Sequence, residues 1–224
     1  FLKYLSPLGK QILLKIFNLV WQTRQFPHIW SQAYILPLVK PQKPKSDVNS
    51  YRPISLTSST CKLLEKIVNR RLRWYLEKEG LLPERLSTIH IESEISTAFT
   101  NKQKVLAIFF DIEKAYDMTW RDNILRSLVN LGFTGNIAHY VNNFLQDRSF
   151  TVRINNTVSS VKMLQNGIPQ GSVISDTLFL LTINSIFQKI SPPIKTHLFA
   201  GDLVIFTHRP SRRCVTFCKA PCKI

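Results

Sequence analysis

An apolar run that ends in a carboxylate constrains the fold of this chain more than any other feature. The run Val105 to Phe110 holds six apolar residues and stops at Asp111, and Asp117 follows six residues later. Such a run is typical of a strand buried on both faces, with the carboxylate at its exposed end. Carboxylates held near one another at a strand tip need a cation, so the pattern suggests a hard divalent metal such as Mg²⁺. Alternatively, Asp111 only ends the strand as a turn or cap residue.

A second stretch could supply the partner carboxylate. Residues 197–207 form two short apolar runs separated by Gly201 and Asp202, which suits a β-hairpin with a two-residue turn. This arrangement puts Asp202 at the hairpin tip. If the hairpin pairs beside the strand that ends at Asp111, the two carboxylates share one edge of a sheet, where a metal could bridge phosphate oxygens.

Four motifs occur in an order and spacing that resemble a known family. They are Tyr-Arg-Pro-Ile-Ser-Leu at 51–56, Phe-Asp-Ile-Glu-Lys-Ala-Tyr-Asp at 110–117, Asn-Gly-Ile-Pro-Gln-Gly-Ser at 166–172 and Phe-Ala-Gly-Asp at 199–202. Together they resemble the reverse transcriptase of jockey-like non-LTR retrotransposons, over about residues 35–207. The resemblance implies an α+β fold with the fingers and palm subdomains of a right-hand polymerase, in which an antiparallel palm sheet packs on helices.

The resemblance also implies roles for individual residues. Asp111 and Asp202 would be the catalytic metal ligands, the backbone carbonyl of Ile112 a third ligand, and an intact site would hold two Mg²⁺ ions. Tyr116 matches the aromatic residue that packs under the sugar and disfavours a 2′-hydroxyl. Gln170 matches a residue that contacts the substrate or the template, although its loop, read without the family, is an ordinary turn before a helix. RNA template, DNA primer or target and deoxynucleotides are the implied partners.

Basic residues are the candidates for phosphate contacts. Arg52 can give bidentate phosphate recognition that lysine cannot. Lys43 and Lys45 lie in a polar loop that is alternatively a solvated linker, and Arg70 lies on the basic face of a predicted helix that is alternatively only solvated. Thirty Lys and Arg against 14 Asp and Glu give a net charge of +16, which favours polyanionic partners. A ribosomal-type or membrane-surface protein would share this charge.

The composition bears on the location of the protein. No apolar stretch reaches the roughly 20 residues that a membrane span needs, so we expect no transmembrane helix and no membrane partner. The cysteines form no disulfide framework, which favours an intracellular setting. The resemblance implies the nucleus and the cytoplasm.

Two departures from the family pattern affect the expected activity. Where the family carries two consecutive aspartates in the hairpin, the first is replaced by Gly201. Between Arg85 and Ser87, a segment that helps to bind template is missing. Both departures indicate a degenerate copy or a faulty gene model, and we expect the chain as written to be inactive or nearly so. Two alternatives are a basic remnant that binds RNA or a hybrid without polymerising, and a relic too truncated to fold.

The chain divides into four predicted parts. They are an N-terminal helix and lead-in to the fingers at 1–50, fingers at 51–104, a palm with the catalytic motifs at 105–207 and a basic, disordered tail at 208–224. We predict helices over 8–24, 57–80, 91–100, 122–131, 136–145 and 173–190, a strand over 33–39 and a hairpin over 150–158. The chain starts at Phe1 without an initiator methionine, so we expect a fragment, and we expect no thumb.

Overall fold

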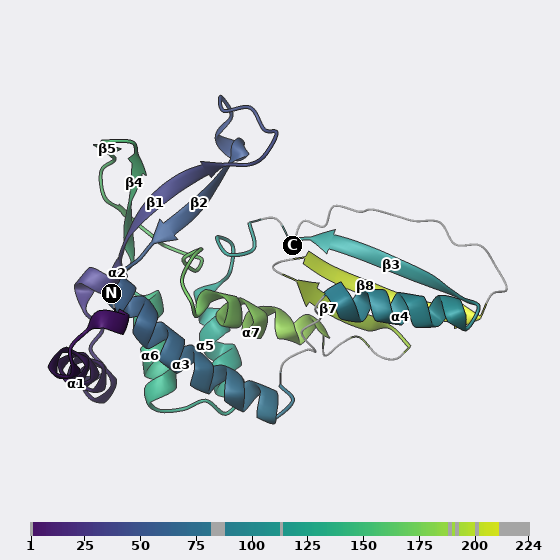
Figure 1. Ribbon diagram of the computed structural model, residues 1–224, viewed down its shortest axis with the longest axis horizontal. Helices are drawn as coiled ribbons and strands as arrows, with labels where there is room; N and C mark the ends of the chain where they lie inside the picture. Colours follow the sequence, from purple (N-terminus) through teal and green to yellow (C-terminus); the bar gives the residue numbers. More distant parts are fainter. Residues whose placement is uncertain are drawn as a thin grey trace.

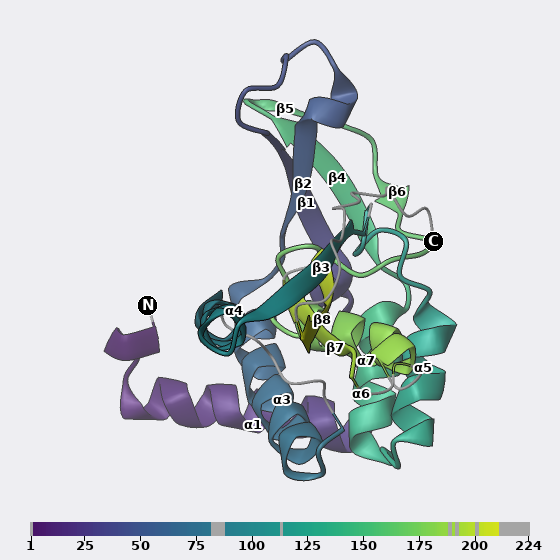
Figure 2. The same ribbon diagram turned by 90° about the vertical axis from the view of Figure 1, so that its right-hand side faces the viewer.

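The computed structural model describes residues 2–81, 88–112, 114–187, 190, 193–199 and 202–210. Both views show the larger sheet standing on a layer of helices (Figures 1 and 2). The smaller sheet extends from one side of that layer in Figure 1 and faces the viewer in Figure 2. The helices are α1 (Pro7–Thr23), α2 (His28–Ser31), α3 (Ser59–Lys78), α4 (Thr88–Thr100), α5 (Arg121–Asn130), α6 (Asn136–Leu145) and α7 (Ser175–Phe187). Short 3₁₀ helices occur at Leu2–Tyr4 and Val48–Ser50.

Helix α3 contributes several buried residues to the hydrophobic core. It begins where the Ser58 hydroxyl accepts the Cys61 amide at 3.4 Å and ends before Gly80, whose φ of 62° suits glycine. Its buried positions recur every three or four residues and pack against α5, α6 and α7. These positions are Cys61, Leu64, Glu65, Val68, Leu72 and Leu76. The amphipathic pattern of the sequence therefore predicted this helix and most of its buried face. Ile67, which the pattern placed on that face, is 41% exposed, and the burial of Cys61 and Glu65 was not predicted.

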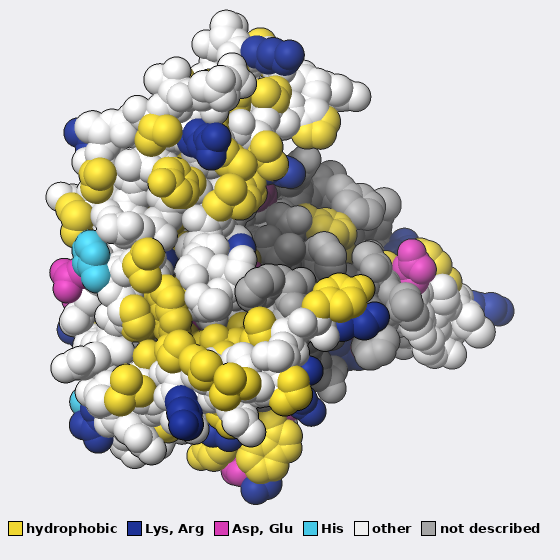
Figure 3. Space-filling view, turned by 60° about the vertical axis from the view of Figure 1, so that its left-hand side comes forward, with side chains coloured by type: hydrophobic (Ala, Val, Ile, Leu, Met, Phe, Trp, Pro, Cys, Tyr) yellow, Lys and Arg dark blue, Asp and Glu magenta, His cyan; other side chains and the backbone are white. Residues whose placement is uncertain are grey.

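Helix α1 lies where it was predicted, but much of its apolar side is not buried. Phe17 and Val20 enter the core, whereas Ile12, Ile16 and Leu19 are exposed. Figure 3 shows hydrophobic side chains on this side of the molecule. The helix packs on α6, and its Phe17 ring lies 6.4 Å from the Trp30 ring of α2, so the side that carries Phe17 and Val20 makes the packing contacts. None of the described helices is long and apolar enough to cross a membrane.

The larger sheet has the strand order β2-β1-β4-β5, and β6 also pairs with β4. The strands are β1 (Gln32–Val39), β2 (Tyr51–Leu56), β4 (Ser149–Ile154), β5 (Thr157–Val158) and β6 (Lys162–Met163). β1 and β2 form an antiparallel hairpin, whereas β1 and β4 run parallel. The predicted strand over 33–39 and the predicted hairpin over 150–158 are confirmed.

The smaller sheet is antiparallel, in the order β3-β8-β7, as the sequence predicted for the sheet that carries Asp111. Its strands are β3 (Gln103–Asp111), β7 (Lys195–Phe199) and β8 (Asp202–Pro210). The prediction that β3 is buried on both faces is wrong. Among the described strands it is an edge, covered by α4 along part of its length, and the Phe109 side chain is 53% exposed.

The C-terminal strand differs from expectation at both ends. Asp202 pairs with Phe199 as the first residue of β8, so it is not one of two turn residues. At the other end, β8 continues to Pro210 and stays paired with Gln103 of β3. The predicted disorder therefore does not apply to residues 208–210, and the remainder of the predicted tail, 211–224, lies outside the described residues.

The loop before α7 joins the smaller sheet to the helices. Gly167 donates its amide to the Thr119 carbonyl at 3.1 Å, and Ile168 donates to the Tyr116 carbonyl at 2.9 Å. A Cβ atom at Gly167 would lie 2.6 Å from the Asp117 carbonyl oxygen, and φ there is 76°. The close approach and the left-handed backbone both require glycine.

We predict that Gly167→Ala lowers the free energy of unfolding by about 2 kcal/mol or more, because the methyl group meets fixed carbonyls. Gly132→Ala is the matched control: Gly132 has a φ of 80° with no atom within 4 Å of the added Cβ. Gly132→Ala should lower the free energy of unfolding by only about 1 kcal/mol, because alanine is strained only by the left-handed backbone at this position. Urea denaturation of the two variants measures the difference, and equal losses would contradict the close approach.

Candidate active site

The pairing of β3 with β8 places Asp111 directly opposite Asp202. Directly paired positions of an antiparallel sheet lie on the same face with Cβ atoms about 4.5–5.5 Å apart. The paired strand ends point toward α7 and the β1–β2 hairpin (Figure 1). Asp111 is exposed at the strand end. The predicted position of the two residues at one edge of a sheet is confirmed, while their role remains a prediction.

The oxygen donors at this strand end are of the kind that Mg²⁺ prefers. Asp111 and Asp202 are carboxylate-bearing positions, and Ile112, which follows β3 directly, offers its backbone carbonyl. Within the part of the chain that the structure describes, no three His, Cys, Asp or Glu side chains gather closely enough to hold a metal ion. Gly201 lies outside the described residues. The two carboxylate positions and the carbonyl are thus of the donor types that a divalent cation takes.

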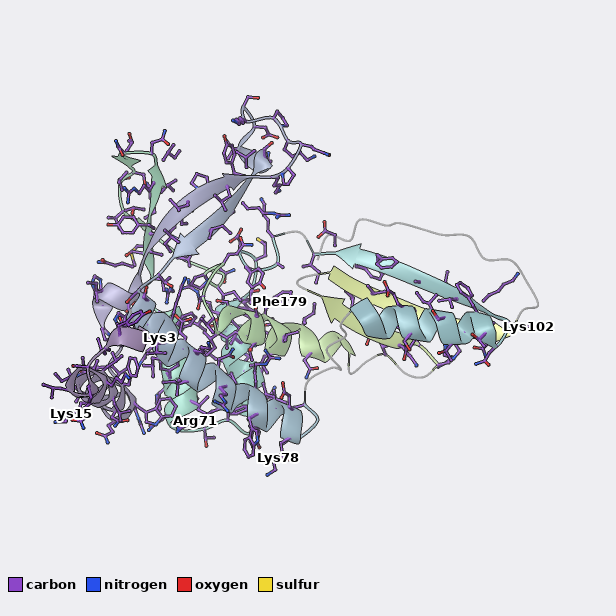
Figure 4. All side chains as sticks on the ribbon, viewed as in Figure 1. Lys3, Lys15, Arg71, Lys78, Lys102 and Phe179 are labelled. Carbon is purple, nitrogen blue, oxygen red and sulfur yellow. The ribbon has the colours of Figure 1, made fainter. Side chains whose placement is uncertain are left out.

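Tyr116 is oriented by the start of α7. Its hydroxyl donates to Asp176 Oδ1 at 2.8 Å, and its ring lies 5.6 Å from the Phe179 ring at an interplanar angle of 31°. Figure 4 labels Phe179 on α7. Asp176 is also the acid in the first turn of α7, beside the positive end of the helix dipole. The structure adds the contact with Tyr116, which fixes the ring beside the loop that carries Gln170.

A cavity of about 200 Å³ lies between the larger sheet and the loop 168–170. Pro53 and Ser55 of β2 line one side, and Gln170 lines another. Asp117 also lines the cavity, and its partial burial raises its pKa while Lys114 opposes that shift. Asp117 is thus held in a different environment from Asp111, which is exposed at the end of β3.

Arg52 does not point into this cavity. Successive side chains of a strand alternate between faces, so Arg52 and Ile54 lie on the face opposite Pro53 and Ser55. Ile54 approaches the loop before α7 from that face, because its Cγ2 atom lies 3.8 Å from the Cβ position of Gly171. The exposed Arg52 side chain therefore lies on the same face of β2 as Ile54, whose side chain approaches Gly171, the residue after Gln170.

The other predicted phosphate contacts come from separate elements. Lys43 and Lys45 are exposed on the β1–β2 loop, which is ordered by the hydrogen bond from the Tyr51 hydroxyl to the Lys45 carbonyl at 2.9 Å. Arg70 is exposed on α3. Further labelled cations, Arg71 on α3 and Lys102 at the far end of the smaller sheet, show that basic residues occupy several faces (Figure 4).

Sequence interpretation missed two buried charged side chains. Glu65 is 0% exposed and Arg148 is 2% exposed. Arg148 donates from Nη1 to the Phe144 carbonyl at 2.8 Å, and burial lowers its pKa while the neighbouring Glu65 carboxylate opposes the shift. Glu65 stands four residues after Cys61 and three before Val68 on the apolar face of α3, and this spacing was the available signal. Arg148, which precedes β4, carries no comparable pattern.

The comparisons with known proteins agree with the motifs. Residues 42–221 match the sequence model of the family described as "Reverse transcriptase (RNA-dependent DNA polymerase)". The probable RNA-directed DNA polymerase from transposon BS of Drosophila melanogaster is 33% identical over 178 residues, which cover 75% of this chain and 20% of the relative. The RNA-directed DNA polymerase from mobile element jockey of the same species is 31% identical over 224 residues, which cover 94% of this chain and 24% of the relative. The chain thus spans a fifth to a quarter of these relatives.

Solved structures show the same fold. Telomerase from Candida tropicalis, in complex with a TWJ fragment of telomeric RNA, superposes with a TM-score of 0.58 at 12% identity, covering 88% of this chain and 40% of that chain. Telomerase from Candida albicans gives a TM-score of 0.58 at 13% identity, with 86% and 40% covered. Since the family model covers most of the sequence, the chain belongs to the reverse transcriptase family and is related to the polymerases of jockey-like non-LTR retrotransposons.

Proposed function

We propose that this domain carries out RNA-templated DNA synthesis and that the chain, with glycine at position 201, does so very slowly or not at all. The observation that carries the first part is the direct pairing of Asp111 with Asp202 at strand ends that point toward α7. An RNA template, a DNA primer or target and deoxynucleotides are the partners this reaction requires. The family match supports the reaction class.

In this reaction a primer 3′-hydroxyl attacks the α-phosphate of a deoxynucleotide and pyrophosphate leaves. Asp111, Asp202 and the Ile112 carbonyl would hold Mg²⁺, which when bound supplies positive charge for the attacking and leaving oxygens. Tyr116 would lie under the sugar, held there by Asp176. Gln170 would contact the nucleotide or template from its loop, and Arg52 would bind phosphate through its guanidinium.

The second part of the proposal rests on Gly201. Glycine offers no carboxylate where the resembled enzymes place a ligand shared by both metals. The loss weakens cation binding and leaves the developing negative charge of the transition state less compensated. A rate loss of several orders of magnitude is expected, because the metals supply much of the transition-state stabilisation.

We predict that Gly201→Asp extends a DNA primer on an RNA template with Mg²⁺ more than tenfold faster than the unchanged chain, since it restores a metal ligand. Primer extension with labelled primer measures the rates. The double variant Gly201→Asp with Asp111→Asn is the control and should be silent. Extension by the unchanged chain at a tenth or more of the Gly201→Asp rate would refute the proposed inactivity.

If the Gly201→Asp variant also incorporates no nucleotide, RNA binding and thermal unfolding distinguish the two remaining alternatives. The net charge of +16 favours a basic remnant that binds nucleic acid. Such a remnant would bind RNA with an affinity that falls steeply as the salt concentration rises. A chain that cannot fold would lose ellipticity without a cooperative thermal transition.

We predict that Tyr116→Ala in the Gly201→Asp background raises the ratio of ribonucleotide to deoxynucleotide incorporation about tenfold or more, because it removes the ring that excludes a 2′-hydroxyl. Tyr116→Phe is the matched variant: it keeps the ring and removes the hydroxyl that donates to Asp176. It should keep most of the discrimination. Competition between the two nucleotides on one primer gives the ratio, and an unchanged ratio for Tyr116→Ala would exclude Tyr116 as the sugar-contacting residue.

A further inference from the structure

The buried carboxylate of Glu65 reaches from α3 to the end of the Gln170 loop. Its Oε2 atom accepts the Ser172 hydroxyl at 2.5 Å and the Val173 amide at 2.8 Å. Its Oε1 atom accepts the Cys61 thiol at 3.2 Å. Both loop contacts of Glu65 converge on one oxygen. Asn69 of α3 also donates its side-chain amide to the Val173 carbonyl at 3.2 Å, so Glu65 and Asn69 together tie residues 172–173 to α3.

The rest of the loop is tied to other elements. Gly167 and Ile168 donate to carbonyls of the segment that carries Tyr116. The Gln170 carbonyl accepts the Ser55 amide of β2 at 2.8 Å. Gln170 therefore lies between an attachment to the smaller sheet at one end and the attachment to Glu65 at the other.

We propose that Glu65 is a positioning residue for nucleotide binding: by anchoring residues 172–173 to α3, it fixes Gln170 relative to Tyr116. The ligand class, a deoxynucleotide, rests on the proposed function. Glu65 itself is fully buried and does not touch the nucleotide.

A role in stability alone explains Glu65 poorly. Replacing a whole buried pair of opposite charges by apolar side chains is often neutral or stabilising, so the burial of Glu65 beside Arg148 is by itself weak evidence for a role in stability. The contacts of Glu65 are instead directed at the loop, and Arg148 lies near enough for the two charges to interact. Replacing Glu65 by methionine would keep the buried volume but leave the Ser172 hydroxyl and the Val173 amide without their acceptor.

Hydrogen exchange tests the anchoring without any need for catalysis. In Glu65→Met, exchange of the Val173 and Ser55 amides should accelerate at least about tenfold, while Ile124 and Leu128 amides of α5 stay unchanged. Glu65→Gln, which keeps one acceptor oxygen, should change these rates less than about threefold. Glu77→Met is the matched control, because Glu77 lies exposed on the same helix and pairs only with Arg73 among the described ion pairs.

Kinetics in the Gly201→Asp background test the link to nucleotide binding. Glu65→Met should raise KM for the deoxynucleotide about tenfold, with kcat and the KM for primer–template within about threefold of the parent. Glu65→Gln should largely retain the parental KM, and Glu77→Met should match the parent.

Different results would overturn the anchoring role, the link to nucleotide binding and the proposed function. Equal acceleration of exchange throughout the protein, or no acceleration at Val173, would overturn the anchoring role, because Glu65 would then act on global stability or not at all. A lower kcat with an unchanged deoxynucleotide KM would overturn the link to nucleotide binding. If Gly201→Asp polymerises nothing, the proposed function fails, while the exchange rates still decide the anchoring.

Discussion

The hydrogen bonds from the Gly167 and Ile168 amides to the Thr119 and Tyr116 carbonyls join two segments that lie far apart in the sequence. Backbone groups buried together must be paired, so these bonds set the distance between the loop before α7 and the segment after β3. The absence of a side chain at Gly167 permits this distance. Tyr116 and Gln170 depend on it for their relative placement.

The smaller sheet brings the two carboxylate positions together through its register alone. A shift of one residue between β3 and β8 would move Asp202 to the other face and separate it from Asp111. The partly buried Phe110 and Ile205 and the buried Leu203 pack on the helical core and oppose such a shift. Hydrophobic packing behind the strands therefore protects a polar arrangement at their ends.

Much of this arrangement could be predicted from local pattern. The helical period in α3 and the apolar runs that flank Asp111 and Asp202 carry their own signals, so the elements and the paired carboxylate positions were predictable. The exposure of Phe109 was not, since an apolar run reads the same in an edge strand and in a central one. The contacts of Glu65 with Ser172 and Val173 span more than 100 residues, and no local period encodes them.

The parallel pairing of β1 with β4 has a consequence for synthesis on the ribosome. Ile35 pairs with Val152, and Gln103 pairs with Pro210, so each sheet closes only after a long intervening stretch has emerged. Such non-local contacts slow folding because the loop must close before the contacts form. Until then, β1 and β3 expose unpaired backbone edges that can pair with other chains. The nascent domain is therefore expected to depend on chaperones until its last strand is made.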